Sequence, residues 1–183
     1  GGGAPLSNWE GVERAASYVQ SKNRLARKRV AVHLYCALDG LTDERVGFLA
    51  EPAVHVHARI AGAAADSQET PRSGIPKLHA AYAEAAHDAE TLHVVLDHTS
   101  TGVAGEDLAA IVDLAVELGC QTVSLNPARS RAFIDDGQGS APDLDSWLDA
   151  YVVALDRCIA HETEGKPVAE ATARVLAQRI LGD

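Results

Sequence analysis

Short apolar runs alternate along this chain with longer segments in which apolar residues recur at helical spacing. Turn-forming residues such as Gly, Asn and Pro follow several of the runs, which is typical of short β-strands. The runs predict strands at residues 29–38, 53–60, 91–97 and 122–125.

The segments between these runs predict helices. Ser7 and Glu10 have the spacing of a capping box ahead of the first helix, and Thr42 is placed to cap a short helix that ends at Leu49. Gly119 is placed to end the most clearly amphipathic helix. The small residues of 61–76 predict a loop. Further helices are expected at residues 77–89, 106–118, 143–161 and 168–181.

Strands that alternate with helices predict βα units and a parallel sheet. Right-handed crossovers would place such units in an arc of a barrel or in an open sheet. The pattern therefore predicts an α/β fold with about four parallel strands.

The chain has 183 residues, enough to bury a sizeable core, and a formal net charge of −10. This charge argues against broad binding to nucleic acid or to an anionic membrane. No apolar run approaches the roughly 18 residues of a membrane span. We therefore expect neither nucleic acid nor a membrane as a partner. The one basic cluster suits the C-terminal end of a helix dipole, and it comprises Lys22, Arg24, Arg27, Lys28 and Arg29.

The three cysteines, Cys36, Cys120 and Cys158, are far apart and have no C-x-x-C spacing. This spacing argues against a disulfide framework and against a self-contained metal or iron–sulfur site. The cysteine usage and the absence of a membrane segment predict a cytoplasmic protein.

Polar residues follow the predicted strands, where βα folds place their functional groups. His55 and His57 alternate along one strand, so both imidazoles face the same side and could share a metal with Asp97 and His98. The pair lies in the middle of its strand, however, which favours structural histidines over a metal-dependent barrel hydrolase. The sequence assigns no catalytic residue and no metal ligand.

Gly2 and Gly3 precede Pro5 and the first helix, an arrangement suited to a cofactor-facing turn. The segment GGAPLSN at residues 2–8 resembles the Gly-Gly-Glu-Pro-Leu-Leu-Asn motif of radical S-adenosylmethionine enzymes, specifically the SPASM-type peptide and protein maturases. The segment ALDGLTDE at residues 37–44 is similar to that family's Thr-Asn-Gly segment. Residues 125–129 stand where the family's sixth strand ends, and residues 164–181 resemble its linker helix.

This resemblance implies a partial (β/α) barrel of the radical-SAM type at residues 1–142, followed by a C-terminal helical linker segment at residues 143–183. It implies S-adenosylmethionine and a 4Fe-4S cluster as cofactors of the parent protein, and a peptide or protein as substrate. The cofactor-binding residues that it implies in this chain are Gly2, Gly3, Asp39, Leu125 and Asn126.

The resemblance also implies that the chain is truncated at both ends. Two strands and the Cys-x-x-x-Cys-x-x-Cys cluster loop would precede Gly1, and auxiliary-cluster cysteines would follow Asp183. We therefore expect the chain alone to be inactive. Its open sheet edges invite a partner or self-association.

The chain departs from the family pattern at several cofactor contacts. Ala4 replaces the glutamate that holds the amino group of S-adenosylmethionine, Asp39 replaces an asparagine, and Arg59 and Ala61 replace residues that face the ribose. These changes leave two readings open. The parent is either a divergent maturase or a catalytically degenerate relative that serves as a binding scaffold.

Overall fold

A computed structural model describes residues 5–26, 30–50, 54–60, 65–84, 94–99, 107–127 and 144–181. These residues form an α/β fold, as predicted, with a parallel sheet of five strands in the order β1-β2-β3-β4-β5. It divides into two compact units, Gly1–Arg59 with Glu69–Val95 and Ile60–Gln68 with Leu96–Asp183. The domain boundary predicted at residue 142 lies outside the described residues and stays a prediction.

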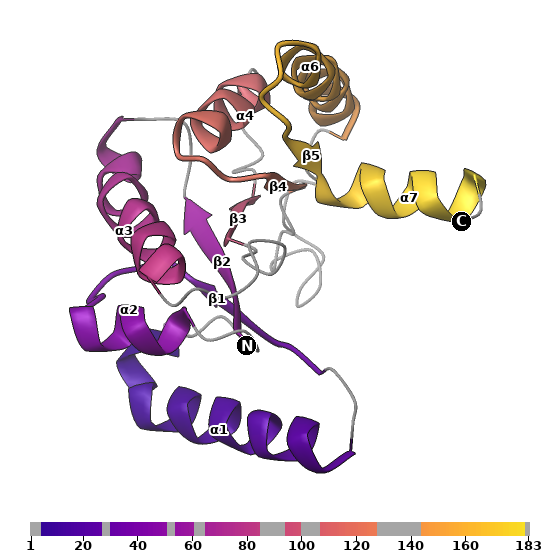
Figure 1. Cartoon of the computed structure of the whole chain (residues 1–183). Coiled ribbons are helices and arrows are strands. Elements are labelled where there is room, and N and C mark those ends of the chain that lie inside the picture. Colours follow the sequence, from indigo (N-terminus) through magenta and orange to yellow (C-terminus); the bar gives the residue numbers. More distant parts are fainter. Residues whose placement is uncertain are drawn as a thin grey trace, which may run out of the picture. The chain divides into compact units, whose positions relative to one another are not determined.

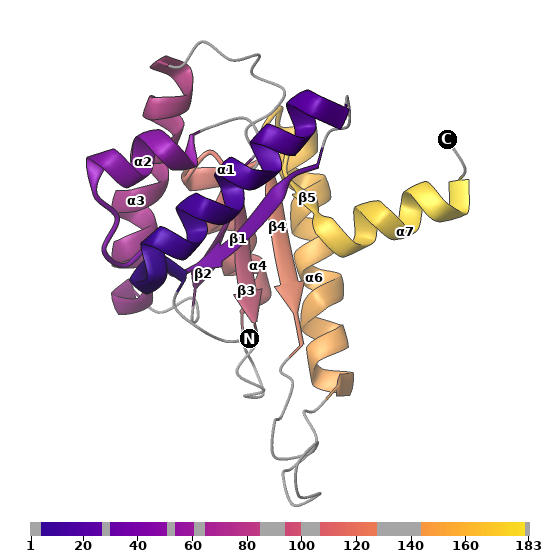
Figure 2. The same cartoon turned by 90° about the horizontal axis from the view of Figure 1, so that it is seen from below.

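The first unit contains β1 (Val32–Cys36) and β2 (Val54–Ile60, up to Arg59), both within predicted strands. The two strands pair in parallel, with His33 opposite His55 and Tyr35 opposite His57. Figures 1 and 2 show the helices α2 (Asp43–Leu49) and α3 (Ala65–Glu84) together on one side of this pair.

Alternating burial gives these strands two different faces. In β1, Leu34 and Cys36 are buried, whereas His33 and Tyr35 are exposed. In β2 the buried residues are Val54, Val56, Ala58 and Ile60. Because successive side chains of a strand point to opposite faces, the apolar positions form the core and the polar ones form a second, open face.

The first helix, α1 (Trp9–Ala26), follows a short 3-10 turn, η1 (Pro5–Asn8). Asn8 Oδ1 accepts a hydrogen bond from the Gly11 backbone N–H at 3.4 Å. The prediction that Ser7 caps this helix is therefore wrong, because Ser7 lies inside the 3-10 turn and Asn8 takes the capping position. Thr42 caps α2 as predicted, since its hydroxyl accepts from the Arg45 N–H.

The helix α3 corrects a second prediction. Residues 61–76 were expected to form a loop, but the helix begins at Ala65 and contains Pro71 and Pro76. Its buried residues Ile75, Leu78 and Tyr82 recur at helical spacing. Burial of this face therefore outweighs the two backbone hydrogen bonds that the prolines cannot donate.

The second unit contains β3 (Val94–Thr99, from Leu96 onward), α4 (Leu108–Glu117) and β4 (Thr122–Asn126). These elements match the predicted strands and helix. Asp107 caps α4 by accepting from the Ala110 N–H at 2.9 Å. Gly119 ends the helix in a left-handed conformation with φ 73°.

The C-terminal part of this unit comprises α6 (Leu144–Thr163), β5 (Ala169–Glu170) and α7 (Ala171–Leu181). The helix predicted at residues 168–181 is correct only from Ala171, because β5 pairs with the first two residues of β4. This fifth strand was not expected. A strand of two residues has no periodicity that a sequence pattern could reveal.

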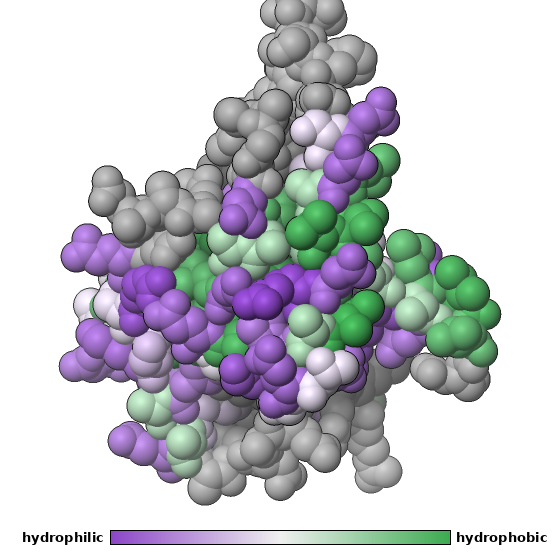
Figure 3. Space-filling model, turned by 90° about the horizontal axis from the view of Figure 1, so that it is seen from above, coloured by the Kyte–Doolittle hydropathy of each residue, from purple (hydrophilic) through white to green (hydrophobic). Residues whose placement is uncertain are grey.

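None of the described helices combines the length and the apolar character that crossing a membrane requires. Figure 3 shows apolar side chains gathered on α7 at the right of the view. The exposed large apolar residues of this helix are Val175, Leu176, Ile180 and Leu181.

Candidate functional site

A pocket of about 260 Å³ lies beyond the carboxyl end of β1, where βα folds usually bind their ligands. One wall is the turn from Leu38 to Leu41, and the other is the α3 surface. The residues from α3 are Thr70, Ser73, Gly74 and Lys77. The volume lies slightly below the roughly 300–1,000 Å³ of most ligand sites, so the pocket is large enough for only part of a cofactor-sized molecule.

The turn that forms this pocket has an unusual backbone. Leu38 has a positive φ of 65°, and Gly40 has a φ of 73°. Leu38 is also fully buried and lies against Gly74, where an added Cβ would approach Leu38 Cδ1 to 3.0 Å. A left-handed conformation at a bulky residue costs about 1–2 kcal/mol. Tight packing between this turn and α3 stabilises it.

Polar groups on both walls give the pocket its chemistry. Thr70 donates its hydroxyl to Asp39 Oδ1 at 3.4 Å, and Lys77 lines the same pocket. Arg45 does not line the pocket, but its guanidinium donates to the Gly40 carbonyl at 2.8 Å and stabilises the turn. A carboxylate and an ammonium in one pocket suit a ligand with hydroxyls or with both charges. The structure thus places the predicted cofactor residue Asp39 at a strand-end pocket.

A second group of polar side chains lies on the open face of β1 and β2. His33 Nδ1 lies 2.9 Å from His57 Nε2, and the His33 ring stacks on His55 with centroids 4.9 Å apart. The Tyr35 ring stacks on His57 at 4.0 Å, and the Arg59 guanidinium lies 6.0 Å from the Tyr35 centroid. We call these five residues the strand-face cluster.

Sequence reasoning found His55 and His57 but missed His33 and Tyr35. The signal was present, because His33 and Tyr35 alternate along β1 in the same way as the histidines of β2. Parallel register then sets residues of the two strands beside each other on one face. Two neighbouring strands with the same alternation of ring side chains are therefore the pattern to look for.

In the second unit, the residues at the ends of β3 and β4 form a network. Asn126 Nδ2 lies 3.1 Å from Asp97 Oδ1, 3.0 Å from Ser124 Oγ and 3.4 Å from the His98 carbonyl. Asp97 and His98 are both buried. These bonds fix the orientation of the Asn126 amide at the strand end.

Leu125, another predicted cofactor residue, is held by a hydrogen bond to β5. Its side chain is buried, and its N–H donates to Glu170 Oε1 at 3.2 Å. Asp39 belongs to the first unit, whereas Leu125 and Asn126 belong to the second. Gly2, Gly3, Ala4 and Ala61 lie outside the described residues.

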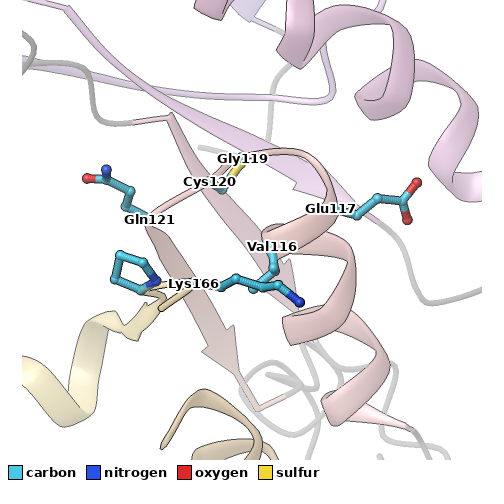
Figure 4. Close-up of a pocket in the computed structure, with 7 residues that line it drawn as sticks. Val116, Glu117, Gly119, Cys120, Gln121 and Lys166 are labelled. Atoms are coloured by element: carbon cyan, nitrogen blue, oxygen red, sulfur yellow. The ribbon is translucent and has the colours of Figure 1, made fainter. Parts of the chain in front are cut away.

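A larger pocket of about 550 Å³ lies at the turn between α4 and β4 (Figure 4). It adjoins the amino end of β4, the end of a βα strand that usually serves stability rather than chemistry. In Figure 4, Lys166 extends along Val116, while Gln121 and Glu117 point away to opposite sides. Cys120 also lines this pocket, and burial raises the pKa of its thiol to about 12, so it is no nucleophile at neutral pH.

Within the described ranges, no group of three or more His, Cys, Asp or Glu side chains is arranged to hold a metal ion. Burial raises the pKa of Cys158 to about 11 and also raises the pKa of Cys36. Buried thiols on three separate elements do not suit an iron–sulfur cluster, which needs several thiolates around one point.

No protein-family model matches this chain, and a search of functionally characterised proteins finds no similar sequence.

Proposed function

We propose that this chain is a core fragment of a radical S-adenosylmethionine maturase-like protein that modifies a peptide or protein. In this proposal the chain provides ligand-facing strands of the barrel, and the iron–sulfur cluster is bound elsewhere in the parent. The proposal rests on the resemblance of the sequence motifs. It is supported most by the order of the strands.

Each strand of the sheet neighbours the next one along the chain. This sequential order is what an arc of a (β/α) barrel requires, whereas a doubly wound sheet reverses its order at a switch point. The alternating burial of β1 and β2 is also consistent with a barrel wall.

The residues in the first unit fit part of S-adenosylmethionine. The Asp39 carboxylate accepts hydrogen bonds, and the pocket beside it holds the Thr70 hydroxyl and Lys77. A carboxylate at this place suits a hydroxyl or amino group of the cofactor, and an ammonium suits its carboxylate. When bound in such enzymes, S-adenosylmethionine supplies the one-electron chemistry that removes a hydrogen atom from the substrate.

The cysteines do not fit the cluster. Cys36, Cys120 and Cys158 are buried, and their raised pKa values keep them protonated. We therefore derive no chemical step for this chain. Its contribution in the proposal is to bind and orient the cofactor and the substrate.

Two alternatives remain as proposals. One is a degenerate relative that serves as a scaffold, which would bind the substrate but not the cofactor. Arg59 favours this alternative, because it replaces a residue that faces the ribose of the cofactor in the family. A metal-dependent barrel hydrolase would depend on His55 and His57. His57 Nε2 lies 2.9 Å from His33 Nδ1. A hydrolytic metal centre usually has three protein ligands, and no such group exists among the described side chains.

The test is binding of S-adenosylmethionine to the full chain, measured by isothermal titration calorimetry. We expect Asp39→Ala to weaken binding about tenfold, the effect of losing one charge-assisted hydrogen bond. Asp39→Asn would instead introduce the asparagine of the family pattern. Asp156→Ala serves as the matched control, because Asp156 is an exposed carboxylate on α6. We expect this control to leave the affinity unchanged.

Two results would overturn the proposal. One is a folded chain that shows no binding at millimolar S-adenosylmethionine, which would favour the scaffold. The other is equal affinity of wild type and Asp39→Ala, which would show that the pocket at β1 does not bind the cofactor.

A further inference from the structure

We infer that the strand-face cluster binds a divalent transition-metal ion through His33 and His57. This inference is independent of the proposed function, because it rests on the geometry of two side chains on β1 and β2. The ion is of the class that imidazole prefers, such as Zn²⁺, Cu²⁺ or Ni²⁺.

The inference rests on the distance between two ring nitrogens. His33 Nδ1 and His57 Nε2 are 2.9 Å apart. Bonds of about 2.0–2.1 Å to one metal place two nitrogens about 2.9 Å apart at a right angle and about 3.3 Å apart at the tetrahedral angle. The observed separation, which is that of a hydrogen bond between the two nitrogens, matches the first value. A shared ion would replace the bridging proton, with a small turn of each ring and little movement of the strands.

The strands also hold the two rings in place. The pair lies on neighbouring strands in parallel register, with the His33 position opposite His55 and the His57 position opposite Tyr35. Stacking of His55 on His33 and of Tyr35 on His57 restricts both imidazole rings. A preorganised pair of ligands loses less conformational entropy on binding than two mobile side chains.

The environment leaves room for the remaining ligands of the ion. His33 is exposed and His57 is half-buried, so the outer side of the pair faces solvent. Because no third His, Cys, Asp or Glu side chain of the described ranges completes the group, water or an external donor would fill the other positions. The site has one protein ligand fewer than a usual catalytic zinc centre, so the inference concerns binding of the ion and assigns it no reaction.

The arrangement differs from the one that the sequence alone suggests. His55 and His57 share a strand and would be the expected pair, but the nitrogen-to-nitrogen distance of 2.9 Å joins His33 to His57, and the His55 ring stacks on His33. The proposed ligands therefore come from two strands, and variants of the three histidines separate the two arrangements.

The experiment measures Zn²⁺ affinity of the tag-free full chain by competition with a chromogenic chelator. We expect His33→Asn and His57→Asn each to weaken Zn²⁺ binding at least about tenfold, because each variant keeps only one of the two proposed ligands. We expect His55→Asn to change the affinity less than about threefold, because His55 supports the ring without binding the ion. His79→Asn on α3 is the control for an unrelated histidine and should have no effect.

A second measurement on the wild-type chain covers the case in which a variant fails to fold. Substoichiometric Cu²⁺ is added during two-dimensional NMR of the imidazole signals, and we expect the signals of His33 and His57 to broaden before those of His79 and His161.

Equal affinity of His33→Asn and wild type would overturn the inference. Loss of binding in His55→Asn but not in His33→Asn would assign the ion to the pair within β2 instead. Simultaneous broadening of all histidine signals by Cu²⁺ would show nonspecific binding and would also overturn it.

Discussion

His161 Nε2 lies 2.6 Å from Asp113 Oδ1 and joins α6 to α4. The imidazole is buried, whereas the carboxylate is half exposed and also accepts a bond from Arg157 Nε at 2.6 Å. One carboxylate oxygen thus serves two donors from successive turns of α6. This contact holds α4 and α6 against each other.

Replacing Asp113 by Asn should lower the free energy of unfolding by about 1 kcal/mol at neutral pH, since buried His161 loses a charged acceptor. Burial alone would raise the pKa of Asp113, but the hydrogen bonds and charges of Arg157 and His161 outweigh it and lower the pKa. A lowered folded-state pKa contributes stability above the unfolded pKa, near 3.9, and loses it as pH falls through the folded value. Denaturant unfolding at several pH values measures this difference.

The control for this prediction is Asp156→Asn, which removes an exposed carboxylate from α6. The difference in the free energy of unfolding between wild type and Asp113→Asn should shrink toward zero in acid. A difference that is constant down to pH values well below the ordinary Asp pKa would contradict the prediction.

Replacing Tyr151 by Phe should destabilise the second unit by about 1–2 kcal/mol, because Glu170 loses one of three donors while it stays buried. Tyr151 Oη lies 2.6 Å from Glu170 Oε2, which also accepts from the Ala173 N–H at 2.7 Å. Thermal unfolding of Tyr151→Phe beside Tyr18→Phe, an exposed tyrosine, provides the comparison. Equal melting temperatures of the two variants would refute the role of this bond.

Alkaline titration followed by tyrosinate absorbance should show two late-ionising tyrosines, Tyr82 and Tyr151, because burial raises the pKa of both, and Tyr151→Phe should remove one of them. Burial first, and then the hydrogen bond to Glu170 and its negative charge, raise the pKa of Tyr151 above its usual range. Because the folded-state pKa is raised, the associated stability is present below the unfolded pKa, near 10, and is lost as pH rises through the folded value. A titration curve of Tyr151→Phe that matches wild type would exclude this assignment.

Two glycine-to-alanine changes in helices should have opposite effects on the free energy of unfolding. A Cβ at Gly47 in α2 meets no atom within 4 Å, so Gly47→Ala should stabilise the chain by about 0.5–1 kcal/mol through helix propensity. A Cβ at Gly74 in α3 would meet Leu38 at 3.0 Å, and this overpacking should cost about 1–3 kcal/mol, more than the propensity gained. Chemical denaturation of both variants tests the pair. A stabilised Gly74→Ala would mean that the Leu38 turn moves freely.

The three cysteines should be unreactive toward a thiol reagent in the folded chain near pH 8. They are buried, and burial raises the pKa of each thiol, so little thiolate is present. All three should react in denaturant. Rapid labelling of one cysteine in the native chain would show that its element opens.

The same chemistry predicts that anaerobic reconstitution of this chain with iron and sulfide produces no reproducible four-iron absorbance. Iron and sulfide analysis of the purified product is the check, with the denatured chain as the control for adventitious iron. A stoichiometric cluster would contradict both this prediction and the division of labour that we propose for the parent.

Much of the fold was predictable from local patterns. The strands near residues 32–36, 54–60, 94–99 and 122–126 and the helix before Gly119 each have a hydrophobic period within their own segment. The N-terminal half of α3 and the strand β5 were not predictable in this way. In α3, small residues and two prolines predict a loop rather than a helix, and β5 is only two residues long.

The sequence by itself determined the α/β class, most element positions and the His55-x-His57 alternation. Only the tertiary structure decided that His33 lies beside His57, that Asn126 meets Asp97, and that Glu170 accepts from Tyr151. The physical reason is the range of the forces. Hydrophobic periodicity acts within one segment and is visible in its residues, whereas contacts between strands depend on register and packing, which the segments set jointly.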